Sequence, residues 1–114
     1  MDKYIQIEWT CPTLEEGRKI ARELVEQKLV ACANIVSHIE SIYHWEGKVE
    51  SDQEVKVLFK TESIHFERIK SYIETHASYD VPAILAIPIL DGNAGYLKWI
   101  SETVITSSVS KGDS

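Results

Sequence analysis

Over residues 4–10, apolar and polar side chains alternate with a period of two, with Ile5 and Ile7 standing against Gln6 and Glu8. Successive side chains of a strand point to opposite faces of its sheet. The alternation therefore predicts a first strand with one buried face.

A helix is expected to begin just after Thr13. Pro12 ends the strand pattern, and Thr13 with Glu16 three residues later has the form of a capping box, in which hydroxyl and carboxylate satisfy free backbone N–H groups. Apolar residues then recur at steps of three and four along one face. They are Gly17, Ile20, Ala21, Leu24 and Val25. This stripe predicts a helix that packs on a sheet.

The next two extended segments predict a hairpin. The first covers residues 30–45 and has a polar interruption at Ser37 and His38, which indicates a bend or bulge. Residues 45–48 contain a glycine turn, and residues 54–61 alternate again as the returning strand.

The second half of the chain repeats a helix and a strand. A helix is expected around residues 63–75, with Phe66, Ile69 and Ile73 as its apolar seam. Residues 82–90 form a nearly unbroken apolar run bracketed by prolines, which predicts a fourth strand. A terminal helix is then expected from the helical spacing of Tyr96, Leu97, Ile100 and Val104.

The order of these elements, β-α-β-β-α-β with a terminal helix, predicts a ferredoxin-like α+β sandwich with both helices on one face of an antiparallel sheet. The fourth strand is apolar on both sides, since Ile84 and Ala86 alternate with Leu85 and Ile87. A sheet face left in water normally shows polar residues at alternate positions. Another copy of the chain is the simplest cover for the second face.

Size and charge exclude several classes of protein. At 114 residues the chain suits a single domain over residues 1–105, with 106–114 too polar to pack and expected to be disordered. A net charge of −6 disfavours nucleic acid as a partner. Neither a signal peptide nor an apolar run of about 18 residues is present, so we expect no membrane association and a cytoplasmic location. Two cysteines suggest reduced thiols, although a disulfide stays open.

Five short strings, in matching order and spacing, resemble the CutA divalent-cation tolerance family. They are residues 31–35, residues 41–48, Lys60 with Thr61, His76 with Tyr79 and Pro82, and residues 96–100. Each string is weak alone, but together they extend from about Thr10 to Val104 and make a specific signal.

The resemblance implies a subunit similar to the PII signalling proteins, assembled as a homotrimer. It also implies a metal-binding protein of divalent-cation tolerance with a regulatory role, and no enzymatic activity. A divalent cation, copper before zinc, is the expected ligand, with no organic cofactor. A PII-like small-molecule sensor, or a trimeric scaffold that binds a partner at clefts between subunits without physiological metal, is the alternative that stays open.

Three positions depart from the pattern of that family, two of them at metal-ligand positions and one, Ala83, at a carboxylate that would serve a cleft between subunits. Trp9 stands at the place of a first-strand cysteine, Thr75 at that of a histidine before His76, and Ala83 at that of a carboxylate after the proline. Of these metal-ligand positions, only His76 matches.

His76 and Cys32 are the candidate metal ligands. The sequence has no Cys-x-x-Cys or His-x-x-x-His motif, and Cys32, His38 and His44 are six residues apart, about 20 Å per step on a regular strand. A metal site must therefore join distant segments or different subunits. Both candidates also have simpler interpretations: His76 as a cap on the last helical carbonyls, and Cys32 as a small core residue.

An inter-subunit cleft is the second candidate site, and its residues are Tyr43, Trp45, Lys60, Tyr79 and Trp99. Their rings suit the wall of a small-molecule site, although packing contacts are the simpler interpretation. Lys60 suits an anion beside the start of the second helix, with a solvated lysine as its alternative.

Two other families that share this order of elements are excluded. Acylphosphatases need an arginine in the loop after the first strand, and residues 10–16 contain two glutamates and no arginine. RNA-recognition domains display aromatic rings over a basic sheet, whereas the third strand exposes mainly charged residues in an acidic chain.

Overall fold

The computed structural model describes residues 3–106. Its elements follow one another in the expected order. They are β1 (Tyr4–Cys11), α1 (Leu14–Glu26), β2 (Cys32–Trp45), β3 (Lys48–Glu62), the 3-10 helix η1 (Ser63–His65), α2 (Phe66–His76), β4 (Ala83–Pro88) and α3 (Ala94–Thr103). The ferredoxin-like α+β prediction is thus confirmed. The expected disordered tail lies, except for Thr106, outside the described residues.

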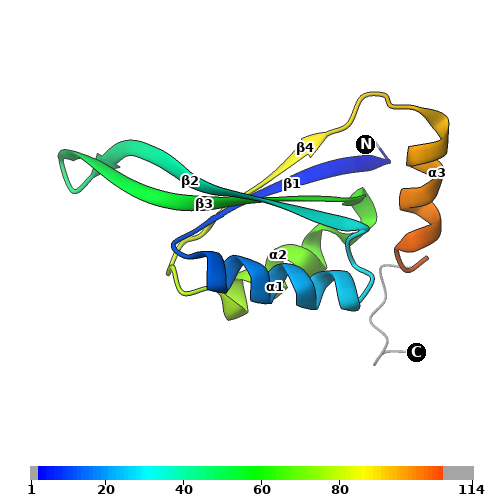
Figure 1. Cartoon of the computed structure of the whole chain (residues 1–114), viewed down its shortest axis with the longest axis horizontal. Helices are drawn as coiled ribbons and strands as arrows, with labels where there is room; N and C mark the ends of the chain where they lie inside the picture. Colours follow the sequence, from blue (N-terminus) through cyan, green and yellow to red (C-terminus); the bar gives the residue numbers. More distant parts are fainter. Residues whose placement is uncertain (1–2, 107–114) are drawn as a thin grey trace.

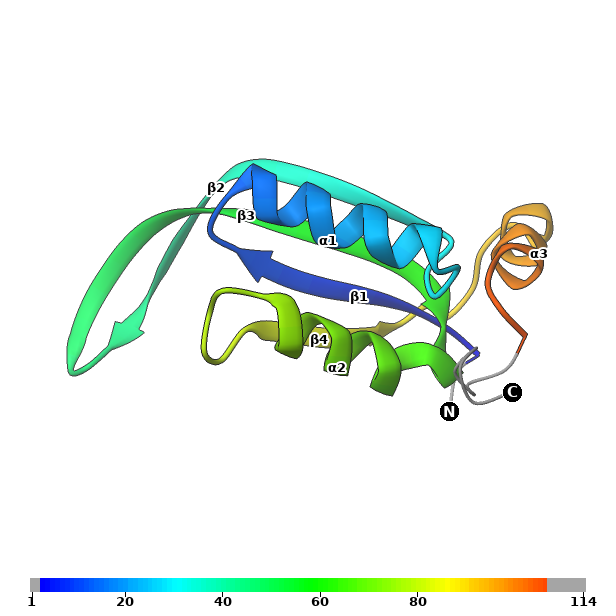
Figure 2. The ribbon, with the colours of Figure 1, turned by 90° about the horizontal axis from the view of Figure 1, so that it is seen from below.

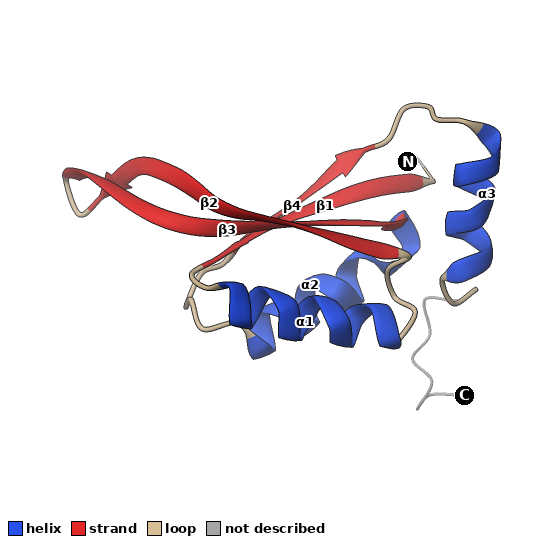
Figure 3. Ribbon diagram, in the orientation of Figure 1, coloured by secondary structure: helices blue, strands red, loops and turns tan. Residues whose placement is uncertain are grey.

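The four strands form one antiparallel sheet in the order β2-β3-β1-β4. Helices α1 and α2 lie side by side across one face of the sheet (Figures 1 and 2). The opposite face, named the open face below, carries neither of them. The outer ends of β2 and β3 project beyond the helices at one end of the molecule, and α3 stands at the other end (Figure 3). Within residues 3–106, no helix is both long and apolar enough to cross a membrane.

The main core lies between the sheet and its two helices. Every second residue of β1 points into it, and its buried members include Ile7, Trp9, Phe59, Leu24 and Ile73. Full burial of one such side chain contributes about 1.5–3 kcal/mol. The Trp9 ring stacks on Phe59 with centroids 6.5 Å apart, so Trp9 is a core residue.

The start of α1 confirms one half of the expected capping box. The Thr13 hydroxyl accepts a hydrogen bond from the backbone N–H of Glu16 at 3.1 Å. The Glu16 carboxylate does not complete the box. It accepts hydrogen bonds from the backbone N–H and the hydroxyl of Ser78, at 3.0 and 2.7 Å. Glu16 therefore ties α1 to the loop before β4. Val25, expected on the apolar face, is 38% exposed.

The hairpin is longer than expected, because β3 begins at Lys48 and not at Glu54. Residues 48–53 show almost no alternation of apolar and polar residues, so the sequence pattern did not predict them as a strand. Backbone pairing with β2 holds them extended. The register shifts between Val36 and Ile39, which confirms the expected bulge at Ser37 and His38. We name residues 39–53 the arm.

A second, smaller core fastens α3 to the end of the sheet. Its buried members are Ala31, Ile100 and Val104, with Tyr4 and Leu97 packed against them. Tyr96 does not belong to this apolar face, since it is more than one third exposed and its hydroxyl approaches Cys32.

Candidate metal and inter-subunit sites

His76 is the last residue of α2, and its ring is held in one orientation. Nδ1 lies 2.8 Å from the carbonyl oxygen of Tyr72, and because a carbonyl can only accept, Nδ1 must carry the proton. The ring also stacks on the Tyr72 ring with centroids 4.0 Å apart. The expected capping role of His76 is therefore confirmed. The same bond leaves Nε2 of the neutral ring with its lone pair, which is the arrangement found in many metal-ligating histidines.

A carboxylate from α1 binds the hydroxyl of the Tyr72 ring on which His76 stacks. The Tyr72 hydroxyl donates to Glu23 Oε1 at 2.6 Å, and Lys19 Nζ donates to Oε2 at 3.1 Å. These two hydrogen bonds lower the pKa of Glu23, and His76 contributes a smaller electrostatic part. Glu23 thus stays ionised beside His76. Sequence reasoning missed it, because only the packing of α1 against α2 brings the two residues together.

Cys32 is the first residue of β2, and the start of β2 and the end of α2, whose last residue is His76, lie toward opposite ends of the sheet (Figure 2). Cys32 pairs with Lys60 on the open face, and its Sγ lies 3.4 Å from the Tyr96 hydroxyl. Cys32 is half-buried, so its interpretation as a core residue is wrong. Within one subunit His76 and Cys32 do not share a site.

No cluster of three or more His, Cys, Asp or Glu side chains within residues 3–106 is arranged to hold a metal ion. None of the three positions that depart from the family pattern adds a metal ligand. Trp9 is in the core, Thr75 donates its hydroxyl to the Ser71 carbonyl at 2.8 Å, and Ala83 begins β4. The chemistry of the donor set therefore fits a divalent cation only in part, through His76 Nε2 with Glu23 nearby.

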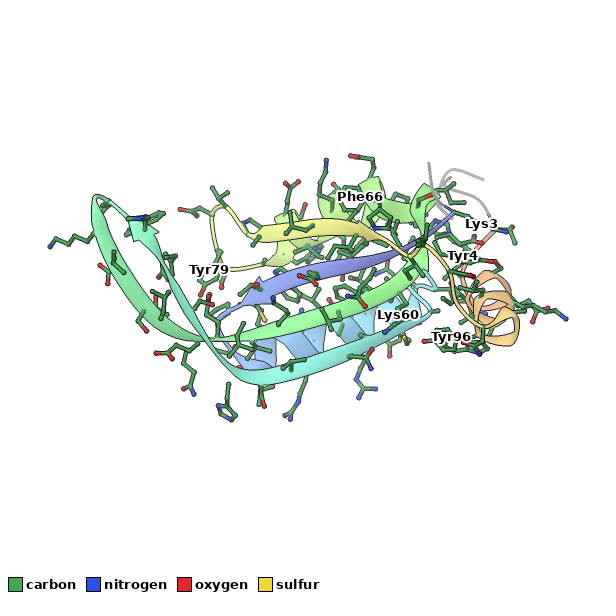
Figure 4. All side chains as sticks on the ribbon, turned by 90° about the horizontal axis from the view of Figure 1, so that it is seen from above. Lys3, Tyr4, Lys60, Phe66, Tyr79 and Tyr96 are labelled. Carbon is green, nitrogen blue, oxygen red and sulfur yellow. The ribbon has the colours of Figure 1, made fainter. Side chains whose placement is uncertain are left out.

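Two of the five cleft candidates come together at the base of the arm. The Tyr43 hydroxyl donates to Asp52. The hydroxyl of Tyr79, which Figure 4 labels, donates to Glu54 at 2.7 Å. The hydrogen bond to Asp52 raises the pKa of Tyr43 to about 12. Burial, and then the bond to Glu54, raise the pKa of Tyr79. Both hydroxyls are therefore protonated donors at neutral pH.

The other cleft candidates lie elsewhere. Trp45 is at the tip of the arm and is 60% exposed. Lys60 and Trp99 are at the α3 end, where Lys60 Nζ donates to Asn34 Oδ1 at 2.8 Å and Trp99 packs on Tyr96 with centroids 5.4 Å apart. Lys60 faces away from the start of α2, so the expected anion site at that helix does not form. The five residues thus fall into separate groups along the long axis of the subunit.

A small hollow lies where the arm bends away from the body. Its volume is about 190 Å³. His38, one of its lining residues, has a φ of 60°, a left-handed conformation that is uncommon outside glycine. The full lining consists of Pro12, Thr13, Leu14, Ser37, His38, Gln53, Glu54 and Val55. The sequence predicted the bulge but not the hollow, because the loop between β1 and α1, which is distant in sequence from the bulge, also lines it.

Comparison with known proteins places the chain in one group. The family model described as CutA1 divalent ion tolerance protein matches residues 5–103. The divalent-cation tolerance protein CutA of Thermus thermophilus is 45% identical over 93 residues, which cover 82% of this chain and 90% of that protein. The chloroplastic protein CutA of Arabidopsis thaliana is 43% identical over 94 residues, 82% of this chain and 52% of that protein. The chain thus spans about half the length of this plant relative.

Solved structures agree with these relatives. The divalent cation tolerance protein of Thermus thermophilus superposes with a TM-score of 0.86 at 41% identity, covering 90% of this chain and 99% of that one. CutA1 of Oryza sativa gives a TM-score of 0.89 at 37% identity, with 93% and 97% covered. The periplasmic divalent cation tolerance protein CutA of Archaeoglobus fulgidus gives 0.86 at 42% identity, with 90% and 99% covered.

Proposed function

The chain belongs to the CutA1 divalent ion tolerance family, and from this premise we propose that it is a homotrimeric protein that binds a divalent cation and serves divalent-cation tolerance. The observation that carries the proposal is the match of the family model over residues 5–103. The proposal includes copper as the preferred cation before zinc, a regulatory role and no enzymatic activity.

The cation is proposed to bind at His76 Nε2, with the carboxylate of Glu23, which shares Tyr72 as a partner with His76, as the second ligand. Imidazole nitrogen and carboxylate oxygen both suit copper and zinc. The Nδ1 bond to the Tyr72 carbonyl orients the ring, and the Tyr72 hydroxyl orients the carboxylate. Because residues 3–106 of one subunit supply only these two groups, binding is weak, and water or a neighbouring subunit supplies the remaining ligands.

The assembly is proposed from the exposed apolar side chains of the arm. Ile42 and Val49 are each 67% exposed, and Leu85 on the open side of β4 is 60% exposed. A two-stranded ribbon is at best marginally stable alone in water, so another surface is expected to cover it. Head-to-tail contacts that close produce a ring. Three such contacts would carry the arm of each copy toward the Lys60 and Trp99 end of the next.

Calorimetric titration of the reduced protein with Cu²⁺ tests the cation site. We expect His76→Ala to weaken binding at least tenfold and Glu23→Gln to weaken it less. His44→Ala, which removes an exposed histidine of the arm, is the matched control and should leave binding unchanged. Identical isotherms for the wild type and His76→Ala would exclude His76 as a ligand.

Native mass spectrometry tests the assembly independently of metal. We expect a particle of three chains at micromolar concentration. A stable, well-folded single chain under these conditions would contradict the homotrimer.

A small-molecule sensor, or a scaffold for a partner, is the second candidate, and the hollow at the base of the arm favours it. Its volume of about 190 Å³ is below the roughly 300–1,000 Å³ of most ligand pockets, so a neighbouring subunit would have to complete it. Binding of a nucleotide or metabolite, unaffected by metal, would support this function over cation binding. The cytoplasmic location stays a prediction, since relatives are named as chloroplastic and periplasmic.

A further inference from the structure

A buried histidine holds the C-terminal end of α3 against the body. His65, the last residue of η1, is fully buried, and its Nε2 lies 2.8 Å from the carbonyl oxygen of Ile105. The carbonyl can only accept, so Nε2 carries the proton and Nδ1 has the lone pair. Nδ1 is buried and has no hydrogen-bond partner in the described part of the chain. The neutral ring thus fits this place, whereas a second N–H would lack an acceptor.

The attachment of α3 to the body is small. Its apolar part is the satellite core of Ala31, Ile100 and Val104, together with the Ile105 side chain, which packs against the main core. The backbone N–H of Ile105 adds a hydrogen bond to the Lys28 carbonyl at 2.9 Å. Loss of the His65 bond therefore removes one of the two hydrogen bonds that hold the backbone of Ile105.

A second polar contact joins α3 to the end of β3. Ser101 donates its hydroxyl proton to Glu62 Oε2 at 2.6 Å, and the Tyr4 hydroxyl donates to Ser101 at 2.7 Å. Glu62 is nearly buried. This contact holds the last turn of α3, so release of the residues after the helix does not require the whole helix to leave.

The charged groups around His65 come from the end of β3, from α2, from the start of β1 and from α3. Glu62 at the end of β3 favours the protonated ring, and Arg68 on α2 disfavours it. Lys3, next to β1, places its ammonium 3.7 Å from the Glu62 carboxylate and offsets part of that charge. On α3, Lys98 and Glu102 lie 3.7 Å apart and are both largely exposed. Burial is the largest effect and lowers the pKa of His65.

We propose that His65 is an acid-sensitive latch, whose protonation at Nδ1 releases residues 104–106 and loosens the end of α3 that they follow. The proton binds more tightly to the released ring, which water can solvate, than to the buried ring. The latch is therefore fully closed above the ordinary histidine pKa of about 6.5, and it opens as the pH falls below that value.

Hydrogen exchange followed by mass spectrometry tests the latch on the full chain. At each pH, the exchange rate of peptides covering α3 is divided by the same rate in His65→Gln, which cancels the intrinsic pH dependence of exchange. The Gln side chain can keep a donor for the Ile105 carbonyl, but it does not titrate. Linkage of a single group with a pKa of about 6.5 predicts that this ratio rises up to about tenfold between pH 7.5 and 5.5.

Peptides of β1 and α1 are the internal reference, and their ratio should stay at one. His38→Gln, which removes an exposed histidine, should behave as the wild type. A constant α3 ratio would overturn the proposal, because acid release would then come from another group such as Glu62, or would not occur. If His65→Gln does not fold, NMR titration of the wild type decides: the amide of Ile105 must shift with the midpoint of the His65 ring, and independent titrations would overturn the latch.

Discussion

The inner half of the β2–β3 hairpin packs against the helices, whereas its outer half, the arm, is exposed. Residues 32–36 of β2 and 56–60 of β3 lie over the helices, where Val57 and Phe59 are completely buried. In the arm, the same two strands continue their pairing, yet Ile42, Trp45 and Val49 are each at least 60% exposed. Backbone pairing is continuous through both halves apart from the bulge. In this hairpin, backbone pairing of the strands therefore does not depend on burial of their side chains.

The arm is held by its own short-range contacts. Glu46 and Gly47 have φ values of 49° and 79°, as a type I′ hairpin turn requires. Ser51 donates to Glu40 at 3.0 Å across the strands. These contacts define the ribbon, but they bury little apolar surface. The large apolar side chains of the arm therefore stay exposed in the single subunit, and the proposed trimer would cover them.

The largest expected effect comes from truncating matched apolar residues in the two halves. Phe59→Ala should lower the free energy of unfolding by about 3–5 kcal/mol, because it leaves a cavity in the main core. Ile42→Ala should change the stability of an isolated subunit by less than about 0.5 kcal/mol. Urea denaturation at two protein concentrations measures both. Concentration dependence of the Ile42→Ala effect would show that another copy covers the arm.

The next effect concerns assembly. Trp45→Ser removes the largest exposed side chain of the arm, and large aromatic residues dominate interface energies. We expect sedimentation to show subunit association weakened about a hundredfold, with the fold unchanged. His44→Ser, one residue away on the opposite side of the strand, is the control. Equal association of the two variants would mean that the tip of the arm is not an interface.

A smaller effect separates the turn of the arm from a helix of the body. An alanine Cβ meets nothing within 4 Å at either Gly47 or Gly95. A steric clash therefore does not distinguish the two substitutions, whereas the backbone conformation does. Gly47→Ala should cost about 1 to 2 kcal/mol, because its φ of 79° suits glycine. Gly95→Ala, in α3, should stabilise by up to about 1 kcal/mol. The two changes in the free energy of unfolding need not be equal in size. If urea denaturation gives changes of the same sign for both variants, this account is refuted.

The smallest effect is an alkaline one at the base of the arm. The pKa of Tyr43 is raised to about 12, so the folded protein holds the Tyr43 proton more tightly than the unfolded chain does. Its contribution to stability is present below the ordinary tyrosine pKa of about 10, and it is lost as the pH rises from about 10 to 12. Absorbance titration of the phenolates checks this. Asp52→Asn should return the Tyr43 midpoint toward 10, and an unchanged midpoint would contradict the assigned cause.

Much of the candidate site lay beyond sequence reasoning for a physical reason. His76 and its capping bond follow from position on α2, since the bond joins residues four apart. Glu23 comes from α1 and Glu54 from β3, and their partners Tyr72 and Tyr79 are far away along the chain. Such pairs depend on how elements pack, and no local spacing encodes them. For Cys32, a local pattern gave the wrong prediction. The flanking alanines suggested a core position, but the side chain lies on the open face of the sheet.

Local rules were enough for the elements themselves. The period of two in β1, the three-and-four spacing in α1 and the glycine turn at Gly47 each arise from backbone geometry within a few residues, so the sequence alone determined the order of elements and the layered fold. Only the tertiary structure decided where β3 begins, which residues meet His76, and how His65 is buried against Ile105. These features depend on contacts between distant segments, whose burial and hydrogen bonds exist only once the sheet, helices and C-terminal end are packed together.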